Sequence, residues 1–352
     1  MTSSAPAHLR GDEALLSVQG LVVEYPTKAG TVQAVSDLSF DVLPGETLGI
    51  VGESGCGKST TGRAVLRLDR ITSGRIRFGE DWIEQADGKH MRHLRRDMQM
   101  IFQDPVGSLN PRRAVKDIVT EGMTVAGAPK SERTTRSTEL LDAVGLAPDR
   151  FADLLPRALS GGQAQRVAIA RALALSPRLL ICDEPVSALD VSVQAQILNL
   201  LEQLKDEFDL TVVFIAHDLG VVRTVSDNVM VMYLGKACEF GDSVDMYADP
   251  AHPYTRALLD SVPLTDPDKG FAGPALKGDV PSPLSPPTGC RFRSRCPRAD
   301  ELCAAEEPQM REHGPGRFVA CHFPLTPVPD TDHAAPQTCG GSSVSTDRRR
   351  PG

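Results

Sequence analysis

The chain lacks any run of apolar residues long enough to cross a bilayer. No window approaches 18 uncharged apolar residues, whereas a membrane-spanning helix needs about 20. The first residues, MTSSAPAHLRGDEALL, also lack the apolar core that marks a secretory signal. We therefore expect no direct membrane span, so that work at a membrane would require docking on other subunits.

The chain is also short of positive charge. Lysine and arginine number 38 against 46 aspartate and glutamate residues, which gives a net charge of −8. A surface that follows a nucleic-acid backbone needs a basic excess. We therefore expect no general nucleic-acid partner.

Cysteine is scarce through most of the chain. Cys56, Cys182 and Cys238 stand singly, which is typical of a protein from a reducing compartment. Four more cysteines stand close together between residues 290 and 321, and they need a separate explanation.

The 352 residues suffice for about two domains. The segments 15–25, 47–55, 179–185 and 211–218 contain apolar runs that predict strands, and the segments 163–175 and 192–208 between them have helical patterns. Alternating strands and helices indicate an α/β fold with a parallel sheet.

Composition divides the chain further. We expect the following parts: a flexible tail at 1–14, a main domain at 15–260 with a mostly helical insertion at about 105–160, a small irregular C-terminal extension at 261–324 that begins with a Pro/Gly-rich linker, and a disordered tail at 325–352.

GESGCGKST lies between a predicted strand and a predicted helix and matches G-x-x-x-x-G-K-[ST]. Its glycines allow backbone N–H groups to curve round a phosphate, Lys58 supplies charge to the β- and γ-phosphates, and Ser59 offers a hydroxyl to Mg²⁺. A Gly-rich turn without chemical meaning is the alternative. The predicted ATP-binding residues here are Gly52, Glu53, Ser54, Gly55, Cys56, Gly57, Lys58, Ser59 and Thr60.

Two more predicted strands end in polar residues. LLICDEP ends in Asp183, which would hold Mg²⁺, and Glu184, which would polarise the attacking water. TVVFIAHD brings His217 to the end of its strand. Taken singly, these could be an ordinary acidic turn and a satisfied polar histidine. Because ligands of open α/β sheets bind at the carboxyl ends of strands, we expect all three in one crevice with Lys58.

LSGGQ, at 159–163, predicts a second anion site. Ser160 is a good N-cap, and Gly161 and Gly162 allow close approach of a ligand to the backbone. A well-capped helix without a ligand is the alternative.

These motifs, in this order, resemble an ATP-binding cassette (ABC) ATPase over residues 15–260. The resemblance implies a P-loop NTPase fold, with a RecA-like core, a helical subdomain and cassettes that pair head to tail around ATP. Ser160, Gly161, Gly162 and Gln163 would then contact the ATP of a partner cassette. The resemblance also implies that Gln103 touches Mg²⁺, that Tyr25 stacks on adenine and that Asp190 links the two sites.

FQDPVGSLNPR, AHDLGVVR, HPYTRALLDSVP and PSPLSPPTGCRFRSRCP resemble the dipeptide/oligopeptide/nickel importer subfamily, in its F-type ATPase. This resemblance implies an ATPase that energises peptide import from the cytoplasmic face of the inner membrane. The implied partners are a paralogous ATPase, two multi-span permeases and an extracytoplasmic peptide-binding protein. The alternative is a soluble ABC ATPase that acts on ribosomes or DNA without a permease.

Cys290, Cys296, Cys303 and Cys321 have the spacing C-x5-C-x6-C-x17-C. A disulfide framework does not fit a chain with a cytosolic ATP site. Zinc sites usually contain C-x₂₋₄-C pairs, which are missing here, although His322 could replace one thiolate. Four thiolates also suit a [4Fe–4S] cluster, and four buried free cysteines are a further alternative. By its resemblance to other peptide-importer ATPases, the set implies [4Fe–4S], with Zn²⁺ second.

Overall fold

The computed structural model describes residues 9–261 and 278–325. Parts of the predicted tails and linker (1–8, 262–277 and 326–352) lie outside the described residues. At the N-terminus, Arg10 donates to the backbone oxygen of Asp41 at 2.8 Å and pairs with Glu46 at 2.7 Å. These bonds join the start of the described chain to the fold.

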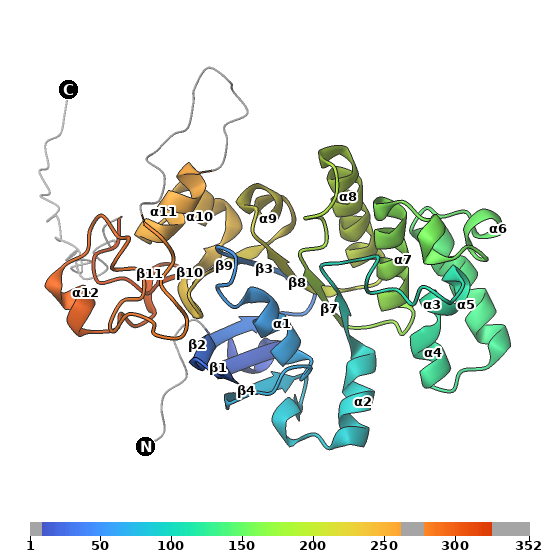
Figure 1. Cartoon of the computed structure of the whole chain (residues 1–352), viewed down its shortest axis with the longest axis horizontal. Helices are drawn as coiled ribbons and strands as arrows, with labels where there is room; N and C mark the ends of the chain where they lie inside the picture. The colour runs from blue at the N-terminus through green and yellow to red at the C-terminus, as the bar shows by residue number, and fades with distance from the viewer. Residues whose placement is uncertain (1–8, 262–277, 326–352) are drawn as a thin grey trace, which may run out of the picture.

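The main sheet has the strand order β11-β12-β10-β9-β3-β8-β7-β6 (Figure 1). Its strands are β3 (Thr47–Val51), β6 (Met98–Ile101), β7 (Leu179–Asp183), β8 (Thr211–Ala216), β9 (Asn228–Tyr233), β10 (Lys236–Asp242), β11 (Arg311–Gly314) and β12 (Arg317–Val319). The pairs from β6 through β7, β8 and β3 to β9 are parallel. Strands β3, β7 and β8 are buried at every position, as expected for strands covered on both faces.

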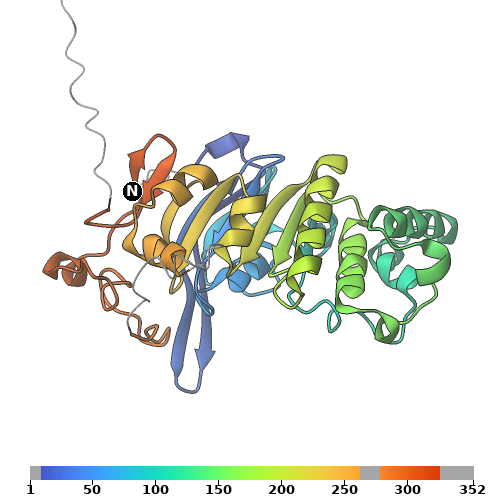
Figure 2. The same cartoon turned by 90° about the horizontal axis from the view of Figure 1, so that it is seen from above.

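A second, antiparallel sheet has the order β2-β1-β4-β5. Its strands are β1 (Leu16–Thr27), β2 (Gly30–Val42), β4 (Ser73–Phe78) and β5 (Asp81–Trp82). Helix α1 packs against β1, β2, β7 and β8 and so joins this sheet to the main one. The tip of the β1–β2 hairpin projects from the molecule in Figure 2. The sequence predicted one parallel sheet and missed this separate layer.

Helices surround both sheets. They are α1 (Lys58–Val65), α2 (Gly88–Asp97), α3 (Val115–Val119), α4 (Glu121–Val125), α5 (Lys130–Ala143), α6 (Pro148–Phe151), α7 (Gly161–Leu173), α8 (Val191–Glu207), α9 (Leu219–Val225), α10 (Ser243–Ala248), α11 (Pro253–Asp260) and α12 (Glu301–Ala305), with short 3₁₀ turns at Gly11–Glu13, Ile83–Gln85 and Pro156–Ala158. Helices α3 to α7 gather at one end of the molecule, beyond β6 (Figures 1 and 2). The predicted helices at 163–175 and 192–208 correspond to α7 and α8.

The C-terminal segment is more regular than the sequence suggested. Strand β12 pairs with β10, so the segment extends the main sheet at its antiparallel edge. Phe292, Phe318 and Val319 are buried, which gives this Arg- and Pro-rich region an apolar core. The sequence predicted a small irregular extension, and within it backbone pairing with β10 supplies local order that apolar periodicity did not reveal.

Candidate nucleotide site

The predicted phosphate-binding loop follows the buried strand β3 and leads into α1. Gly57 has φ = 102° and is the N-cap of α1. A Cβ atom there would lie 2.2 Å from the backbone oxygen of Ala34, and one on Gly52 would lie 2.1 Å from that of Met232. Only glycine fits these two positions, because the loop is pressed against β2 and the end of β9.

Lys58 lies inside this loop. It is 4% exposed, and its Nζ donates to the backbone oxygens of Gly52 at 2.7 Å and Glu53 at 3.1 Å. Next to it, the Ser59 hydroxyl donates to Oδ1 of Asp183 at 2.7 Å. Burial raises the pKa of Asp183, and the neighbouring Lys58 opposes that rise. A hydroxyl and a buried carboxylate are oxygen donors that suit Mg²⁺, so the residues present fit this ion.

Glu184 follows Asp183 and lies between two polar side chains. Gln103 Nε2 donates to its Oε2 at 3.0 Å, and His217 Nδ1 lies 3.4 Å from the same oxygen. Glu184 has φ = 46°, a left-handed conformation that side chains other than glycine adopt rarely. Its side chain is 14% exposed and that of His217 is 56% exposed. The carboxylate is therefore oriented by neighbours on two other strand ends and still open to a water molecule.

Tyr25 lies beside the loop helix. Its hydroxyl donates to Asp69 Oδ2 at 2.8 Å, and Asp69 pairs with Arg63 of α1 at 3.0 Å. Burial raises the pKa of Tyr25, with the Asp69 bond adding to the effect. Within the loop, Cys56 is buried, and burial raises the pKa of its thiol.

The signature residues lie elsewhere, at the N-terminus of α7. Ser160 Oγ accepts from the Gln163 N–H at 3.3 Å, and Gln163 Oε1 accepts from the Ser160 N–H at 2.9 Å, which forms a capping box. Helix α7 packs with α3, α5, α8 and β6, whereas α1, which begins at Lys58, packs against β1, β2, β7 and β8. The structure therefore does not bring Ser160–Gln163 into the site that holds Lys58.

The turn before α8 packs on the signature glycines. A Cβ atom on Gly162 would lie 2.7 Å from Cγ1 of Val193, and one on Gly161 would lie 3.4 Å from Leu189. Asp190, between these neighbours, is exposed at the N-cap of α8. Asp190, which the resemblance assigned to linking the two ATP sites, thus lies beside the signature residues Gly161 and Gly162.

Two residues that touch the loop were missed by the sequence. The Arg295 guanidinium pairs with the Glu53 carboxylate, and the Tyr254 hydroxyl accepts from the Glu53 N–H at 2.9 Å. Arg295 stands 242 positions beyond Glu53. No local pattern indicates such a contact.

The four C-terminal cysteines line one cavity of about 10 Å³ with His252, Phe292 and His322. Such a volume is at the lower limit of what can hold one water molecule. Burial raises the pKa of Cys290, of Cys296 and of Cys321, the last to about 11. Within residues 9–261 and 278–325, no group of three or more His, Cys, Asp or Glu side chains is placed to hold a metal ion. The described residues therefore do not support the predicted metal centre.

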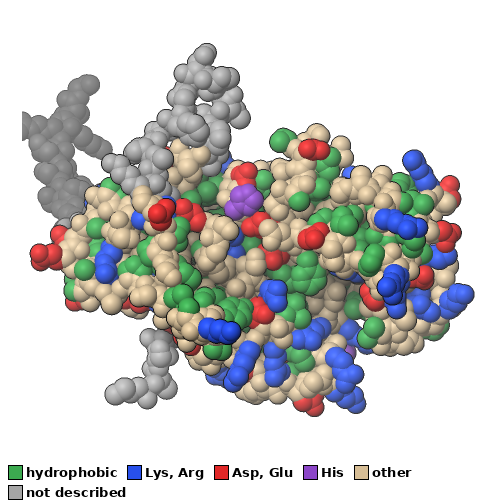
Figure 3. Space-filling model, in the orientation of Figure 1, with side chains coloured by type: hydrophobic (Ala, Val, Ile, Leu, Met, Phe, Trp, Pro, Cys, Tyr) green, Lys and Arg blue, Asp and Glu red, His purple; other side chains and the backbone are tan. Residues whose placement is uncertain are grey.

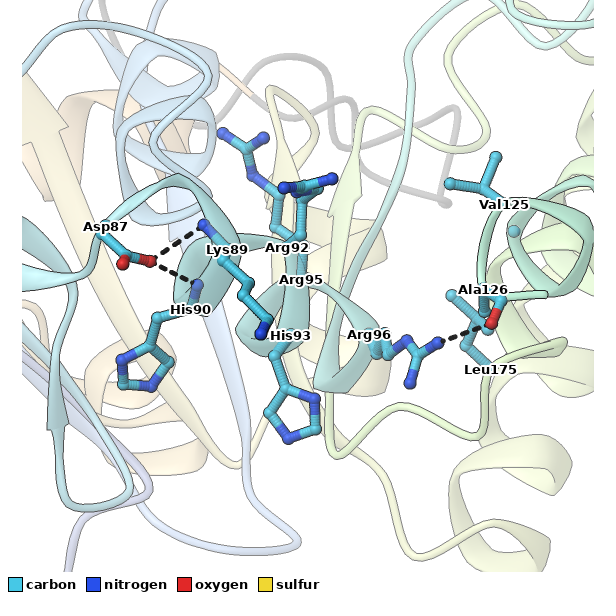
Figure 4. Close-up of a pocket in the computed structure, with 11 residues that line it drawn as sticks. Asp87, Lys89, His90, Arg92, His93, Arg95, Arg96, Val125, Ala126 and Leu175 are labelled. Atoms are coloured by element: carbon cyan, nitrogen blue, oxygen red, sulfur yellow. Dashed lines mark hydrogen bonds between the residues drawn. The ribbon is translucent and has the colours of Figure 1, made fainter.

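A basic groove of about 830 Å³ runs between α2 and the helical end of the molecule. On one side Lys89, Arg92, His93 and Arg96 line it, and Val125, Ala126 and Leu175 lie opposite (Figure 4). Arg96 Nη2 reaches across to the backbone oxygen of Ala126 at 3.3 Å. Lys and Arg side chains also gather over α2 on the face shown in Figure 3. Basic charge is thus concentrated at this groove despite the net negative charge of the chain.

In the described part of the chain, no helix combines the length and the apolar character that crossing a membrane requires. Two family models match the sequence. The model described as ABC transporter matches residues 35–187, and the model described as oligopeptide/dipeptide transporter, C-terminal region, matches residues 238–303. The second match includes Tyr254 and Arg295.

Curated relatives match over most of the chain. The oligopeptide transport ATP-binding protein AppF of Bacillus subtilis is 50% identical over 85% of this chain and 92% of its own length. A putative peptide import ATP-binding protein of Brucella ovis is 49% identical over 87% and 97%, respectively. OppF of Haemophilus influenzae, also an oligopeptide transport ATP-binding protein, is 47% identical over 84% and 90%.

Solved structures agree with this similarity. The cbiO1 protein of Clostridium perfringens, part of the ABC transporter complex cbiONQ, has a TM-score of 0.60 at 31% identity and covers 67% of this chain and 91% of its own. A dimer of the ATP-binding cassette MJ0796 in a post-hydrolysis state with ADP and Pi has a TM-score of 0.59 at 29% identity, covering 65% and 98%. With this fold, this site and these relatives, the chain belongs to the ATP-binding proteins of ABC transporters, in the group that carries the oligopeptide/dipeptide transporter C-terminal region.

Proposed function

We propose that this chain hydrolyses ATP to energise peptide import through a membrane transporter. The observation that carries the proposal is the convergence of Lys58, Ser59, Asp183, Glu184 and His217 at the carboxyl ends of β3, β7 and β8. The match to the oligopeptide/dipeptide transporter C-terminal region and the names of the relatives support peptides as the cargo.

Each residue of the site has a separate task in this proposal. Lys58 exchanges its bonds to the Gly52 and Glu53 oxygens for phosphate oxygens. Ser59 and Asp183 would hold Mg²⁺, which neutralises charge on the β- and γ-phosphates when it is bound. Glu184 orients the attacking water and takes its proton.

Gln103 and His217 act on Glu184. Both lie beside its Oε2, at 3.0 and 3.4 Å, so they hold the carboxylate in one orientation. Tyr25 lies beside the loop helix, through its bond to Asp69, and would stack on the adenine. Gln103 also stands at the end of β6, where the sheet leads to the helical end of the molecule.

The separation of the two anion sites supports a cassette dimer as the working unit. Ser160–Gln163 are exposed or half-buried on α7 and lie away from the loop of their own chain. We propose that they contact the γ-phosphate of ATP held by a second, paralogous ATPase. Val191, 81% exposed next to Asp190, would be covered in the same interface. ATP then stabilises the closed dimer, and hydrolysis removes that stabilisation.

The basic groove supports a docking site for a permease. Its charge on one side and apolar Val125, 82% exposed, on the other fit an amphipathic cytoplasmic segment with acidic side chains. In this proposal two multi-span permeases hold the ATPase at the cytoplasmic face of the inner membrane, and an extracytoplasmic peptide-binding protein delivers the cargo.

A charge reversal tests the docking site. Arg92→Glu should reduce recovery of the permeases when the tagged ATPase is purified from membranes. Lys28→Glu is the matched control, because Lys28 is exposed in the β1–β2 turn, outside the groove. Equal recovery with both variants would contradict docking in the groove, and recovery of ribosomes or DNA in place of permeases would favour the soluble alternative.

Glu184→Gln tests the catalytic assignment. Removal of a general base lowers rates about 10²–10⁴-fold, while the phosphate loop is left intact. We expect the variant to bind ATP, to lose turnover and to accumulate as a dimer detectable by gel filtration. Turnover at the normal rate would refute Glu184 as the base.

A metal centre on the four cysteines remains a hypothesis within this proposal, either [4Fe–4S] or Zn²⁺. Its support is that all four thiols and His322 line one cavity. Binding would require that cavity to widen and the thiols to lose their protons. Iron, sulfide and zinc analysis of anaerobically purified protein tests it, and protein that contains none of these would remove the hypothesis.

A further inference from the structure

Glu53, the first variable residue of the phosphate-binding loop, is held at both its backbone and its side chain. Its N–H donates to the Tyr254 hydroxyl at 2.9 Å. Its carboxylate accepts from both terminal nitrogens of Arg295, at 2.5 and 3.0 Å. The Arg295 side chain is 5% exposed and that of Glu53 is 26% exposed. A bidentate arginine–carboxylate ion pair that is mostly shielded from water is both strong and specific in geometry.

Arg295 is itself held by an aromatic cluster. Its guanidinium carbon lies 5.8 Å from the centre of the Tyr233 ring. That ring contacts Tyr254 at 4.7 Å and Phe292 at 5.2 Å, between ring centres. All three rings are at most 1% exposed. The anchor of Glu53 is therefore a packed part of the core and not a mobile surface arginine.

The same short segment lines the cysteine cavity. Cys290, Phe292 and Cys296 all border that cavity, and Arg295 directly precedes Cys296. One position before Phe292 the chain is fixed again, because Arg291 bonds to Gln33 and Ser36 of β2 at 2.8 and 2.9 Å. The C-terminal region thus touches the nucleotide loop and the strand behind it.

Fixing Glu53 also fixes the groups that bind phosphate. The Glu53 carbonyl oxygen accepts from Lys58 Nζ at 3.1 Å and from the Cys56 N–H at 3.3 Å. A shift of residue 53 would therefore move both the lysine and the turn that carries it. None of the catalytic steps above uses the Glu53 side chain, so its pairing with Arg295 needs another explanation.

We infer that Arg295 is a positioning residue for nucleotide binding, through which the C-terminal region holds the phosphate-binding loop in its binding conformation. The inference rests on the proposed ATP site. A loop ordered in advance loses less conformational freedom when ATP binds, which raises affinity without changing the chemical step. Arg295→Gln should weaken binding about tenfold, equivalent to about 1.4 kcal/mol. The KM for ATP should rise while kcat stays the same.

Calorimetry with the full-length chain, Mg²⁺ and a non-hydrolysable ATP analogue tests this inference. Arg295→Gln and Glu53→Gln should each weaken binding by a similar factor. The double variant should bind no worse than either single one, because the two side chains act as a pair. Arg295→Lys keeps the positive charge but cannot form the bidentate pair. Its affinity for the analogue should lie between those of the unmodified chain and Arg295→Gln.

Arg293→Gln is the matched control, because Arg293 is in the same segment but its Nη1 bonds to Thr288 Oγ1 at 3.1 Å. It should bind like the unmodified chain. Steady-state ATPase assays on the transporter complex then supply the KM and kcat of each variant.

Unchanged affinity in a folded Arg295→Gln variant would overturn the inference, as would additive losses in the double variant. A fall in melting temperature alone, with normal affinity, would mark the pair as merely structural and overturn it too. If Arg295→Gln fails to fold, Glu53→Gln replaces it in the same binding measurement, because Glu53 is the more exposed partner of the pair.

Lys58→Ala separates this inference from the proposed function. Normal analogue binding by Lys58→Ala would refute the nucleotide site itself. Loss of binding in Lys58→Ala together with normal binding in Arg295→Gln would refute only the role of Arg295.

Discussion

A methyl group added at Gly57 should destroy nucleotide binding, whereas the same change at Gly55 should not. Both glycines are in the phosphate-binding loop and both have positive φ, 102° at Gly57 and 78° at Gly55. An added Cβ on Gly57 would lie 2.2 Å from the Ala34 oxygen, whereas one on Gly55 would meet nothing within 4 Å. The pair therefore separates the cost of backbone conformation from the cost of a collision.

The magnitudes follow from these distances. A left-handed conformation costs an alanine about 1–2 kcal/mol relative to glycine, and both variants bear this cost. Only Gly57→Ala must also relieve a collision of its new Cβ atom with the backbone oxygen of Ala34. Ordinary van der Waals contact for a Cβ atom begins at 3.4 Å, so the loop or β2 must move by 3.4 − 2.2 = 1.2 Å. Relieving such a crowded contact typically costs about 1–3 kcal/mol.

Thermal unfolding and binding of a non-hydrolysable ATP analogue measure the two effects. We expect Gly55→Ala to lower the unfolding free energy by about 1–2 kcal/mol and to bind the analogue with nearly normal affinity. Gly57→Ala should also lose affinity for the analogue, by up to about 10²-fold, because about 1–3 kcal/mol goes into relieving the collision in the binding loop. Equal losses of affinity in both variants would refute the reasoning, because the close approach to Ala34 would then have no role.

Two further predictions concern neighbours of the catalytic and signature residues. Gln103→Glu would place a second carboxylate about where Nε2 now lies, 3.0 Å from Glu184 Oε2. Because a neighbouring like charge raises a carboxyl pKa, the acid limb of the kcat–pH profile should move to higher pH. Gln103→Ala is the control and should leave that limb in place, whereas an unmoved limb in Gln103→Glu would contradict the contact. Gly162→Ala would bring a Cβ to 2.7 Å from Val193 and should destabilise the protein by about 1–3 kcal/mol in thermal unfolding; adding Val193→Ala should restore most of that loss, and no recovery would mean that crowding by Val193 is not its source.

Much of the site could be predicted because its motifs are local. The glycine spacing before Lys58 follows from the turn that a phosphate loop needs between a strand and a helix. Asp183, Glu184 and His217 follow buried apolar strands, and parallel strands bring their carboxyl ends to one edge. The contacts among Ser59, Asp183, Glu184 and His217 agree with that expectation.

The architecture around the site was less predictable. Of the antiparallel strands, only β1 was predicted as a strand-like segment, whereas β2 and β4 were not predicted, and nothing local separates their sheet from the parallel one. Strands β11 and β12 have four and three residues, which is too short for a periodic pattern. Their order depends on pairing with β10, a distant segment.

The sequence by itself determined the family and predicted the phosphate loop, the strand-end carboxylates and the signature helix, since each depends on residue type at short spacing. Only the tertiary structure decided that Arg295 reaches Glu53, because 242 residues separate them and the contact requires β9, α11 and the C-terminal segment to pack together. It also decided that the four cysteines share a cavity of about 10 Å³. Spacing along a chain does not measure the space that its folded segments enclose.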